Sequence, residues 1–202
     1  MPENPHHTYG NIDIYLFDQL LKGTYQNCKK VLDIGCGAGR NLHYFLRNDY
    51  EVFGIDQNPD AINAVQFLSA GIAPNNPIEN FSVADADRLP FPDGSFDLVI
   101  SSAVLHFAND RTHFDIMVNE AFRILRPNDY FFARLASDIG IESLVENIGN
   151  GRYLLPDGSV RFLVNEDILL SYTNKFGKLH EPIKTTNVQN LRCMTTWCVQ
   201  KL

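Results

Sequence analysis

The sequence predicts a doubly wound α/β fold with a mostly parallel, seven-stranded sheet and an antiparallel final hairpin. Apolar strand-like runs alternate with helical patterns along most of the 202 residues, and this alternation is typical of parallel sheets covered by helices. A Gly-rich turn joins the first predicted strand to a helix, as in open α/β sheets that bind nucleotides. Only a short link separates the last two predicted strands, and such a link suits an antiparallel pair.

The composition predicts one globular domain over residues 1–202. The chain is 45% hydrophobic and 20% charged, which is enough apolar material for one core. Its formal net charge is −7 without a long run of Lys and Arg, so we expect no nucleic acid partner. The four cysteines lack metal-ligand spacing, and no apolar run suits a signal peptide or a membrane span. We therefore expect a cytoplasmic monomer or homodimer that holds no metal and contacts no membrane.

The predicted elements follow one another in the order of an α/β sheet. The N-terminal region 1–24 is read as a loose arm followed by a helix over 12–21, and Asn58 and Asn165 are read as N-caps of later helices. Further helices are expected over 41–47, from Asn58 to Gly71, over 112–125 and from Asn165 to Gly177. Strands are expected over 31–34, 52–55, 81–84, 96–101, 130–135, 179–186 and 192–200.

The stretch from Val31 to Arg40 carries the first chemical signal. Gly35, Gly37 and Gly39 form a G-x-G-x-G pattern, whereas the dinucleotide fingerprint would place its last glycine where Arg40 stands. Asp56 ends the second predicted strand, near the roughly 20-residue spacing of an acceptor for ribose hydroxyls. The pattern predicts a ligand with a ribose and requires no pyrophosphate. A Gly-rich turn without any ligand is the alternative.

The run Asp33-Ile34-Gly35-Cys36-Gly37-Ala38-Gly39 resembles motif I of class I S-adenosylmethionine-dependent methyltransferases. The later motifs follow in order, so the resemblance covers nearly the whole chain. It implies a Rossmann-like fold, S-adenosylmethionine as the cofactor, and a cofactor loop that includes Asp33, Gly35, Cys36, Gly37 and Gly39. The run 89–97, Leu-Pro-Phe-Pro-Asp-Gly-Ser-Phe-Asp, resembles the methyltransferase-11-like branch that acts on small molecules and quinones.

The resemblance also implies contacts to the adenosine part of the cofactor. Asp56 is expected to accept from the ribose hydroxyls, and Gln57 to border the adenine. Asp85 is expected to accept from the adenine amino group, while the backbone N–H of Ala86 meets the ring. The alternatives are that Asp85 only caps the next loop and that Asp87 makes the contact.

Three further residues are expected at the methionine end of the cofactor. The resemblance implies that the backbone of Ser101 and Ser102 reaches this end. Arg40 is expected either to pair with the cofactor carboxylate or to face solvent. The run Gly39-Arg40-Asn41 also resembles the tellurite- and thiopurine-detoxifying branch, which would suit a sulfur or metalloid acceptor.

The acceptor side is predicted from the strand ends and from one long connection. His106 is expected to act as a general base, or only to pack beside the cofactor. Arg134 is expected to hold an anionic substrate, or to form a salt bridge. Residues 137–165 are too apolar for a solvated linker and are expected to form a partly helical lid that carries Tyr153. The N-terminal arm, with Tyr9, is the second predicted cover, and packing on the sheet edge is the alternative for 137–165.

The sequence therefore predicts S-adenosylmethionine-dependent methyl transfer to a small-molecule acceptor through oxygen, nitrogen, or sulfur or a metalloid. Residues 101–106 lack the Asn- or Asp-Pro-Pro-aromatic tetrad of enzymes that modify bases. One rival is a protein that binds the cofactor without turnover. The other is a nicotinamide-dependent oxidoreductase, which Arg40 and the lack of a second substrate domain disfavour.

Overall fold

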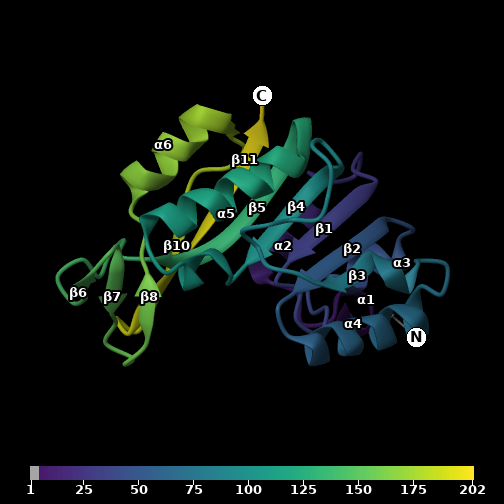
Figure 1. The fold of residues 1–202 in the computed structure, drawn as a ribbon, viewed down its shortest axis with the longest axis horizontal. Coiled ribbons are helices and arrows are strands. Elements are labelled where there is room, and N and C mark those ends of the chain that lie inside the picture. Colours follow the sequence, from purple (N-terminus) through teal and green to yellow (C-terminus); the bar gives the residue numbers. More distant parts are fainter. Residues whose placement is uncertain (1–4) are drawn as a thin grey trace.

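A computed structural model describes residues 5–202, and its centre is one eight-stranded sheet. Seven strands follow the order β10-β11-β5-β4-β1-β2-β3, and the short β9 pairs with β11. The parallel strands, the antiparallel β10–β11 hairpin and the doubly wound arrangement confirm the predicted fold (Figure 1). The strands are β1 (Lys30–Ile34), β2 (Glu51–Asp56), β3 (Phe81–Val83), β4 (Phe96–Ser102), β5 (Leu125–Ser137), β9 (Gly177–Leu179), β10 (Lys184–Val188) and β11 (Arg192–Lys201).

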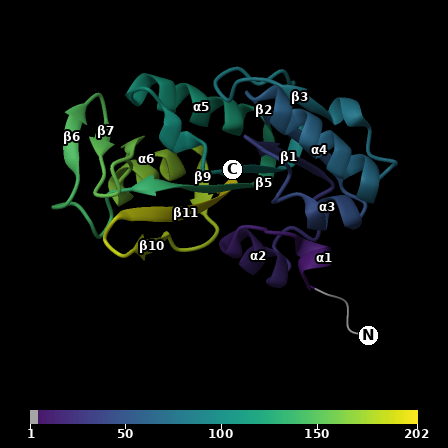
Figure 2. The same cartoon turned by 90° about the horizontal axis from the view of Figure 1, so that it is seen from below.

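Helices cover both faces of this sheet. Figure 2 shows α2 and α3 on one side of the strands and α5 and α6 on the other. The N-caps were predicted correctly, because the side chains of Asn58 and Asn165 accept from backbone N–H groups of the first turns of α4 and α6. The helices are α1 (Pro5–Tyr9), α2 (Ile14–Leu21), α3 (His43–Arg47), α4 (Pro59–Ile72), α5 (Arg111–Ile124) and α6 (Glu166–Phe176), with the 3₁₀ turns η1 (Ile78–Asn80) and η2 (Leu105–Phe107).

Each face of the sheet has its own apolar core. Successive side chains of a strand point to opposite faces, so Val31 packs with residues of α2, α3 and α4, whereas Leu32 packs with residues of α5 and α6. All seven residues of β4 are buried. This double burial explains why the central parallel strands are continuous apolar runs in the sequence.

The N-terminal region differs from the predicted loose arm. Residues 5–9 form the short helix α1, and Met1–Asn4 lie outside the described residues. The ring of Tyr9 stacks on Tyr44 of α3, with 5.6 Å between the centroids, and meets the edge of Phe17 of α2 at 4.8 Å. These aromatic contacts hold α1 against the other helices.

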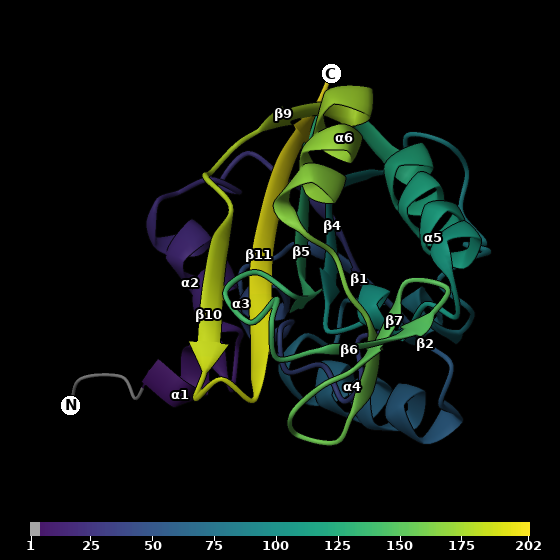
Figure 3. The same cartoon turned by 90° about the vertical axis from the view of Figure 1, so that its left-hand side faces the viewer.

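The segment 137–165 also differs from its prediction, because it contains no helix. It forms a second, three-stranded antiparallel sheet, called the mini-sheet here, of β6 (Glu146–Gly149), β7 (Arg152–Leu154) and β8 (Val160–Phe162). Asn150 and Gly151 both have positive φ, +58° and +76°, and an Asn-Gly pair in this conformation closes a tight hairpin. Figure 3 shows the mini-sheet beside the lower end of β11, and Figure 1 shows it at one end of the main sheet.

Within residues 5–202, no helix has the length and apolar character needed to cross a bilayer. The four cysteines are all buried and free.

Candidate functional site

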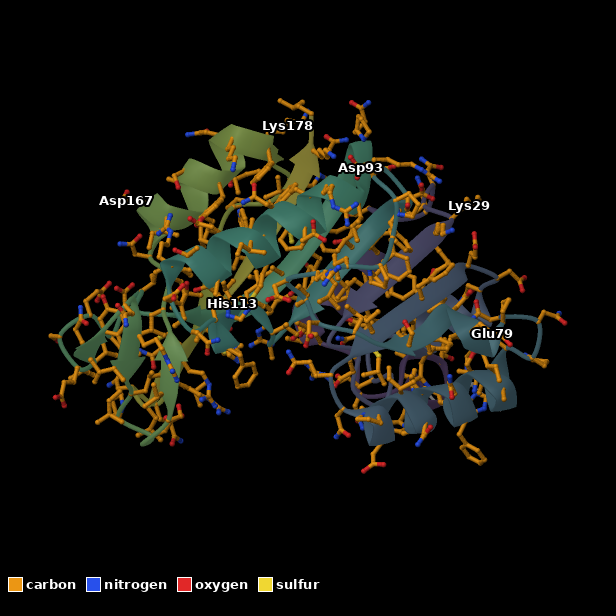
Figure 4. The ribbon with its side chains drawn as sticks, viewed as in Figure 1. Lys29, Glu79, Asp93, His113, Asp167 and Lys178 are labelled. Carbon is orange, nitrogen blue, oxygen red and sulfur yellow. The ribbon has the colours of Figure 1, made fainter. Side chains whose placement is uncertain are left out.

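Two cavities lie at the carboxyl ends of the parallel strands, where open α/β sheets bind ligands. The first has a volume of about 390 Å³ and the second about 290 Å³, and Ala103 lines both. In Figure 4, the labelled His113 lies near the carboxyl ends of the strands, and it lines the first cavity. Lys29 and Asp93 lie near the opposite end of the sheet. The first cavity is lined by Ile34, Gly35, Ile55, Asp56, Gln57, Ala84, Ala86, Ala103, Val104, Phe107, Asn109, His113 and Met117.

The glycine loop after β1 forms one wall of the first cavity. A Cβ at Gly35 would lie 2.3 Å from Cγ2 of Val104, so a larger residue would not fit. Gly37 has a φ of +53°, and a Cβ there would meet nothing within 4 Å. The space beside Gly35 is therefore filled by Val104, whereas the space beside Gly37 is free. A ligand can approach the main chain closely at Gly37.

Asp56 connects the glycine loop to the end of β2. Its Oδ2 accepts the backbone N–H of Gly37 at 2.9 Å, and its Oδ1 accepts that of Asn58 at 2.9 Å. Each oxygen of an ionised carboxylate can accept a second hydrogen bond. Asp56 and its neighbour Gln57 both line the cavity, so the carboxylate is held in place with acceptor capacity left for hydroxyl groups.

The end of β3 contributes small residues rather than a carboxylate. Ala84 and Ala86 line the first cavity, whereas Asp85 is exposed and lies outside its lining. Asp87 also lies outside the lining, but its Oδ2 is 3.5 Å from Nε2 of His113. The predicted backbone contact at Ala86 has a suitable position, and the predicted contact of Asp85 to an adenine would be made from the rim.

Residues that follow β4 close the first cavity, and the sequence analysis did not single them out. They are Phe107, Asn109, His113 and Met117. His113 and Met117 are four residues apart on α5 and therefore share one face of the helix. That spacing is the signal that could have identified them.

Asp33 is a buried carboxylate next to the glycine loop. Its exposure is 1%, and neither of its oxygens has a hydrogen-bond partner among the described residues. Burial raises its pKa to about 7, and the charge of Arg40 and the nearby side-chain amide of Asn41, which is outside hydrogen-bond geometry, oppose this shift. A buried, ionised carboxylate without a partner is unfavourable. Either protonation of Asp33 or a cationic group of a ligand would remove this cost.

Three predicted loop and strand residues lie behind the cavity walls. Cys36 is buried, and its sulfur would lie 2.9 Å from a Cβ at Gly54. Gly39 lies against two side chains of α4, and Ser101 is fully buried with an unpartnered hydroxyl. Any contact of Cys36 or Ser101 to a ligand would use the backbone, which is what the resemblance implied for Ser101.

The second cavity lies between the main sheet and the mini-sheet and is strongly charged. Arg40 donates to Oγ of Ser102 at 3.1 Å, and Arg134 donates to Oδ2 of the buried Asp13 at 2.8 Å. Arg134 thus forms the salt bridge that was one of its two predicted roles, while still lining the cavity. The lining residues are Asp13, Arg40, Ser102, Ala103, His106, Arg134, Ala136, Leu155, Ser159, Arg161, Arg192 and Met194.

His106 lines the second cavity but is poorly suited to act as a base. It is 6% exposed, and its Nδ1 accepts the backbone N–H of Ala136 at 3.2 Å. The neutral ring therefore carries its hydrogen on Nε2. Burial, together with the charges of Arg161 and Arg192, lowers the pKa to about 4. This geometry opposes the predicted catalytic role and favours the packing alternative.

Tyr9 and Tyr153, which were predicted to cover the acceptor, are not brought to either cavity. Tyr9 contacts the aromatic rings of α2 and α3, and Tyr153 lies on β7, where its hydroxyl is 3.5 Å from Nδ2 of Asn147. The mini-sheet instead contributes Leu155, Ser159 and Arg161 to the lining. A one-residue shift of strand register moves every side chain to the other face of a sheet, and residue spacing alone does not fix the register.

Ala103 marks the junction of the two cavities. Its φ is +65°, which is unusual for a residue with a Cβ, and its N–H donates to the carbonyl of Arg134 at 2.7 Å. Backbone strain of this kind is concentrated at functional sites. No feature of the sequence indicates that Ala103 adopts a positive φ.

The fold is that of a Rossmann-like α/β protein, with two adjoining cavities at the carboxyl ends of its parallel strands. The family model for the methyltransferase domain matches residues 32–133, about half of the chain, and the chain belongs to this family. The match runs from β1 to β5 and so includes the glycine loop, Asp56 and Ala103.

Named relatives fall in the same class. The chain is 36% identical over 107 residues to a fatty-acid O-methyltransferase of Mycolicibacterium smegmatis, covering 51% of this chain and 35% of the relative. It is 32% identical over 124 residues to the 27-O-demethylrifamycin SV methyltransferase of Amycolatopsis mediterranei, covering 59% and 44%. The chain thus spans less than half the length of these curated relatives. A SAM-dependent methyltransferase of Methanosarcina mazei shares the fold, with a TM-score of 0.66 and 24% identity over 91% of this chain and 97% of that one.

Proposed function

We propose that this chain transfers a methyl group from S-adenosylmethionine to a small-molecule acceptor. The observation that carries the proposal is the pair of carboxylates on either side of the glycine loop. Asp56 is held by two backbone N–H groups and lines the first cavity, and Asp33 is buried without a partner. One carboxylate suits the hydroxyls of a ribose, and the other suits an ammonium group.

The residues of the first cavity fit the proposed cofactor. The ribose hydroxyls would donate to Asp56. The α-ammonium group would compensate the charge of Asp33, which lies beside the glycine loop but is not part of either cavity lining. The adenine would lie between apolar side chains such as Ile55 and Met117. Gly37 leaves open space beside the loop, where the ligand would approach the backbone. A volume of about 390 Å³ lies in the size range of small-molecule sites, roughly 300–1,000 Å³.

The cofactor, when bound, supplies a methyl group already activated on a sulfonium. The chain's own contribution is then to hold the methyl group and the acceptor in line and to exclude water. We place the acceptor in the second cavity, because Ala103 joins it to the first. Arg40 donates to Ser102, next to Ala103, in the lining of the second cavity, and we assign it to the carboxylate of the cofactor.

The acceptor cavity supports a nucleophile that needs no base from the protein. Its titratable acceptors among the described residues are Asp13, which is paired with Arg134, and His106, whose Nδ1 is occupied. An ionised oxygen, a thiolate or a neutral amine could each attack a sulfonium methyl without general-base help. The names of curated relatives include both O-methyltransferases and N-methyltransferases, which fits an oxygen or a nitrogen nucleophile.

Methyl transfer is tested with S-adenosylmethionine that carries a deuterated methyl group. The full chain is incubated with this donor and with small molecules extracted from its own host, and products are sought by their mass shift. A labelled small molecule together with S-adenosylhomocysteine supports the proposal. Cofactor binding without any labelled product would favour the binding-only alternative.

A further inference from the structure

The second cavity has an unusual charge for this protein. Its charged lining residues are one acid, Asp13, and four arginines, Arg40, Arg134, Arg161 and Arg192. The whole chain has a formal net charge of −7. A concave site whose charge opposes that of the rest of the molecule concentrates ligands of the opposite sign.

Two of these arginines already have partners at one side of the cavity. Arg134 forms its ion pair with Asp13, and Arg40 donates to Ser102. The proposed function uses Arg40 for the cofactor. The charge of Arg134 is therefore compensated by Asp13, and that of Arg40 would be compensated by the cofactor carboxylate.

The other two arginines have no hydrogen-bonded carboxylate partner among the described residues. Arg161 of β8 donates to the carbonyl of the preceding residue at 2.7 Å, and its guanidinium lies 4.9 Å from the ring centroid of Phe107. Arg192, the first residue of β11, forms an ion pair with Oδ2 of Asp157 at 3.9 Å, which is too long for a hydrogen bond. The Oδ1 of Asp157 already accepts from the backbone N–H and the hydroxyl of Ser159. Donors on both guanidinium groups are therefore free for a ligand.

The charges of Arg161 and Arg192 both affect His106 in the wall of the second cavity. Both charges help to lower the pKa of His106, after the larger effect of burial. They belong to different sheets, because Arg161 comes from the mini-sheet and Arg192 from the end of the main sheet, which lie together in Figure 3. Leu155 of the mini-sheet and Met194 of β11 belong to one apolar cluster with Ala136, so the two sheets meet at the cavity.

We propose that Arg161 and Arg192 form a subsite for an anionic group, a carboxylate or a phosphate, on the methyl acceptor. The apolar part of the acceptor packs against Ala136, Leu155 and Met194, which line the same cavity. Planar guanidinium groups match the oxygens of such anions with two parallel hydrogen bonds. This inference rests on the proposed function, because it assigns the substrate class of the same acceptor cavity.

The test measures binding of three six-carbon probes by calorimetry: hexanoate, hexyl phosphate and the neutral hexanamide. They are titrated into the full chain with and without saturating S-adenosylhomocysteine. We expect at least one anionic probe to bind about tenfold or more tighter than hexanamide, with an affinity that falls as salt is added. Comparison of the carboxylate with the phosphate identifies the group that the subsite takes.

Variants assign the binding to these two residues. Arg161→Gln and Arg192→Gln should each weaken the anionic probe about tenfold and leave hexanamide and S-adenosylhomocysteine unchanged. Arg161→Lys retains the charge and should recover part of the affinity. Arg88→Gln removes an equal charge from an exposed side chain that lines neither cavity and should have no effect.

The outcomes separate this inference from the proposed function. Equal binding of hexanamide, full anion binding in both Gln variants, or no binding of either anionic probe would overturn the anionic subsite. If the wild-type chain bound an anionic probe but did not bind S-adenosylhomocysteine, the proposed function would be overturned and the anionic subsite would stand. The titrations without S-adenosylhomocysteine report on the arginines independently of the cofactor.

Discussion

The single residue Asp56 makes three interactions in our proposal. Its carboxylate accepts the backbone N–H groups of Gly37 and Asn58, and it binds the ribose hydroxyls. Asp56→Ala removes a charged acceptor, and hydrogen bonds to charged groups contribute roughly 1.5–3 kcal/mol each. We expect the affinity for S-adenosylhomocysteine, measured by calorimetry, to fall about tenfold or more. Asp60→Ala removes an exposed carboxylate four residues away and should leave the affinity unchanged. Equal affinities of the two variants would remove Asp56 from the site.

Asp33 predicts a pH dependence of stability in the free protein. Its pKa is about 7 in the folded state and about 3.9 in an unfolded chain. Between these values the folded state retains a proton that the unfolded state has lost, so the free energy of unfolding falls as pH rises through this window. Asp33→Asn should remove this fall, measured by urea unfolding at pH 4 to 8. The same slope in both proteins would show that Asp33 does not titrate in this way.

The same residue predicts a proton linkage of cofactor binding. If the ligand ammonium pairs with an ionised Asp33, binding below pH 7 must release a proton. Calorimetry in buffers of different ionisation enthalpy should report this release at pH 6, and Asp33→Asn should not show it. A wild-type protein that releases no proton would place the ammonium elsewhere.

His106 should remain neutral throughout the physiological range. Its pKa is lowered to about 4 by burial and by two arginines, and its Nδ1 is occupied by the N–H of Ala136. Proton NMR from pH 5.5 to 8, with His106→Asn to assign the signal, should show no titration of this ring. A midpoint near 6.5 would restore His106 as a candidate base.

At the scale of elements, the hairpin turns decide where the mini-sheet places its side chains. Gly151 has a φ of +76°, and a Cβ there would lie 2.5 Å from Cε2 of Phe162, which stacks on Phe114 of α5. Gly158 has a φ of +80° with nothing within 4 Å of its Cβ position. Gly158→Ala should cost about 1 kcal/mol of backbone strain. Gly151→Ala should cost more because Phe162 must also move, as urea unfolding will show. Equal costs would mean that Phe162 adjusts freely.

The mini-sheet also shows where sequence reasoning failed at this scale. The apolar content of 137–165 indicated a cover for the acceptor, but the prediction of helix ignored Asn150-Gly151, a strong hairpin signal. The first, second and fourth strands were predicted closely because each has a run of apolar residues, and the fourth is buried along its whole length. Single charged residues such as Arg161 and Arg192 carry no such pattern, and only the pairing of β8 and β11 with their neighbours brings them together.

At the scale of the whole molecule, the fold class and the glycine-loop side of the first cavity followed from the sequence, whereas the acceptor side followed only at His106 and Arg134, which line the second cavity. Asp56 and the glycine loop are adjacent strand ends, so parallel topology brings them together once the strands are known. The second cavity combines residues from α2, β5, the mini-sheet and β11. These segments are far apart in the chain, and their meeting depends on packing at the edge of the sheet rather than on local spacing.

The most direct test of the account is calorimetric titration of the full chain with S-adenosylmethionine, S-adenosylhomocysteine and NAD. The single ribose acceptor at Asp56, the partnerless Asp33 and the side chain of Arg40 at the last fingerprint position favour a nucleoside with an ammonium group over a dinucleotide. We predict one site per chain for each of the two adenosyl ligands and no detectable binding of NAD. Binding of NAD without binding of S-adenosylmethionine would contradict the account.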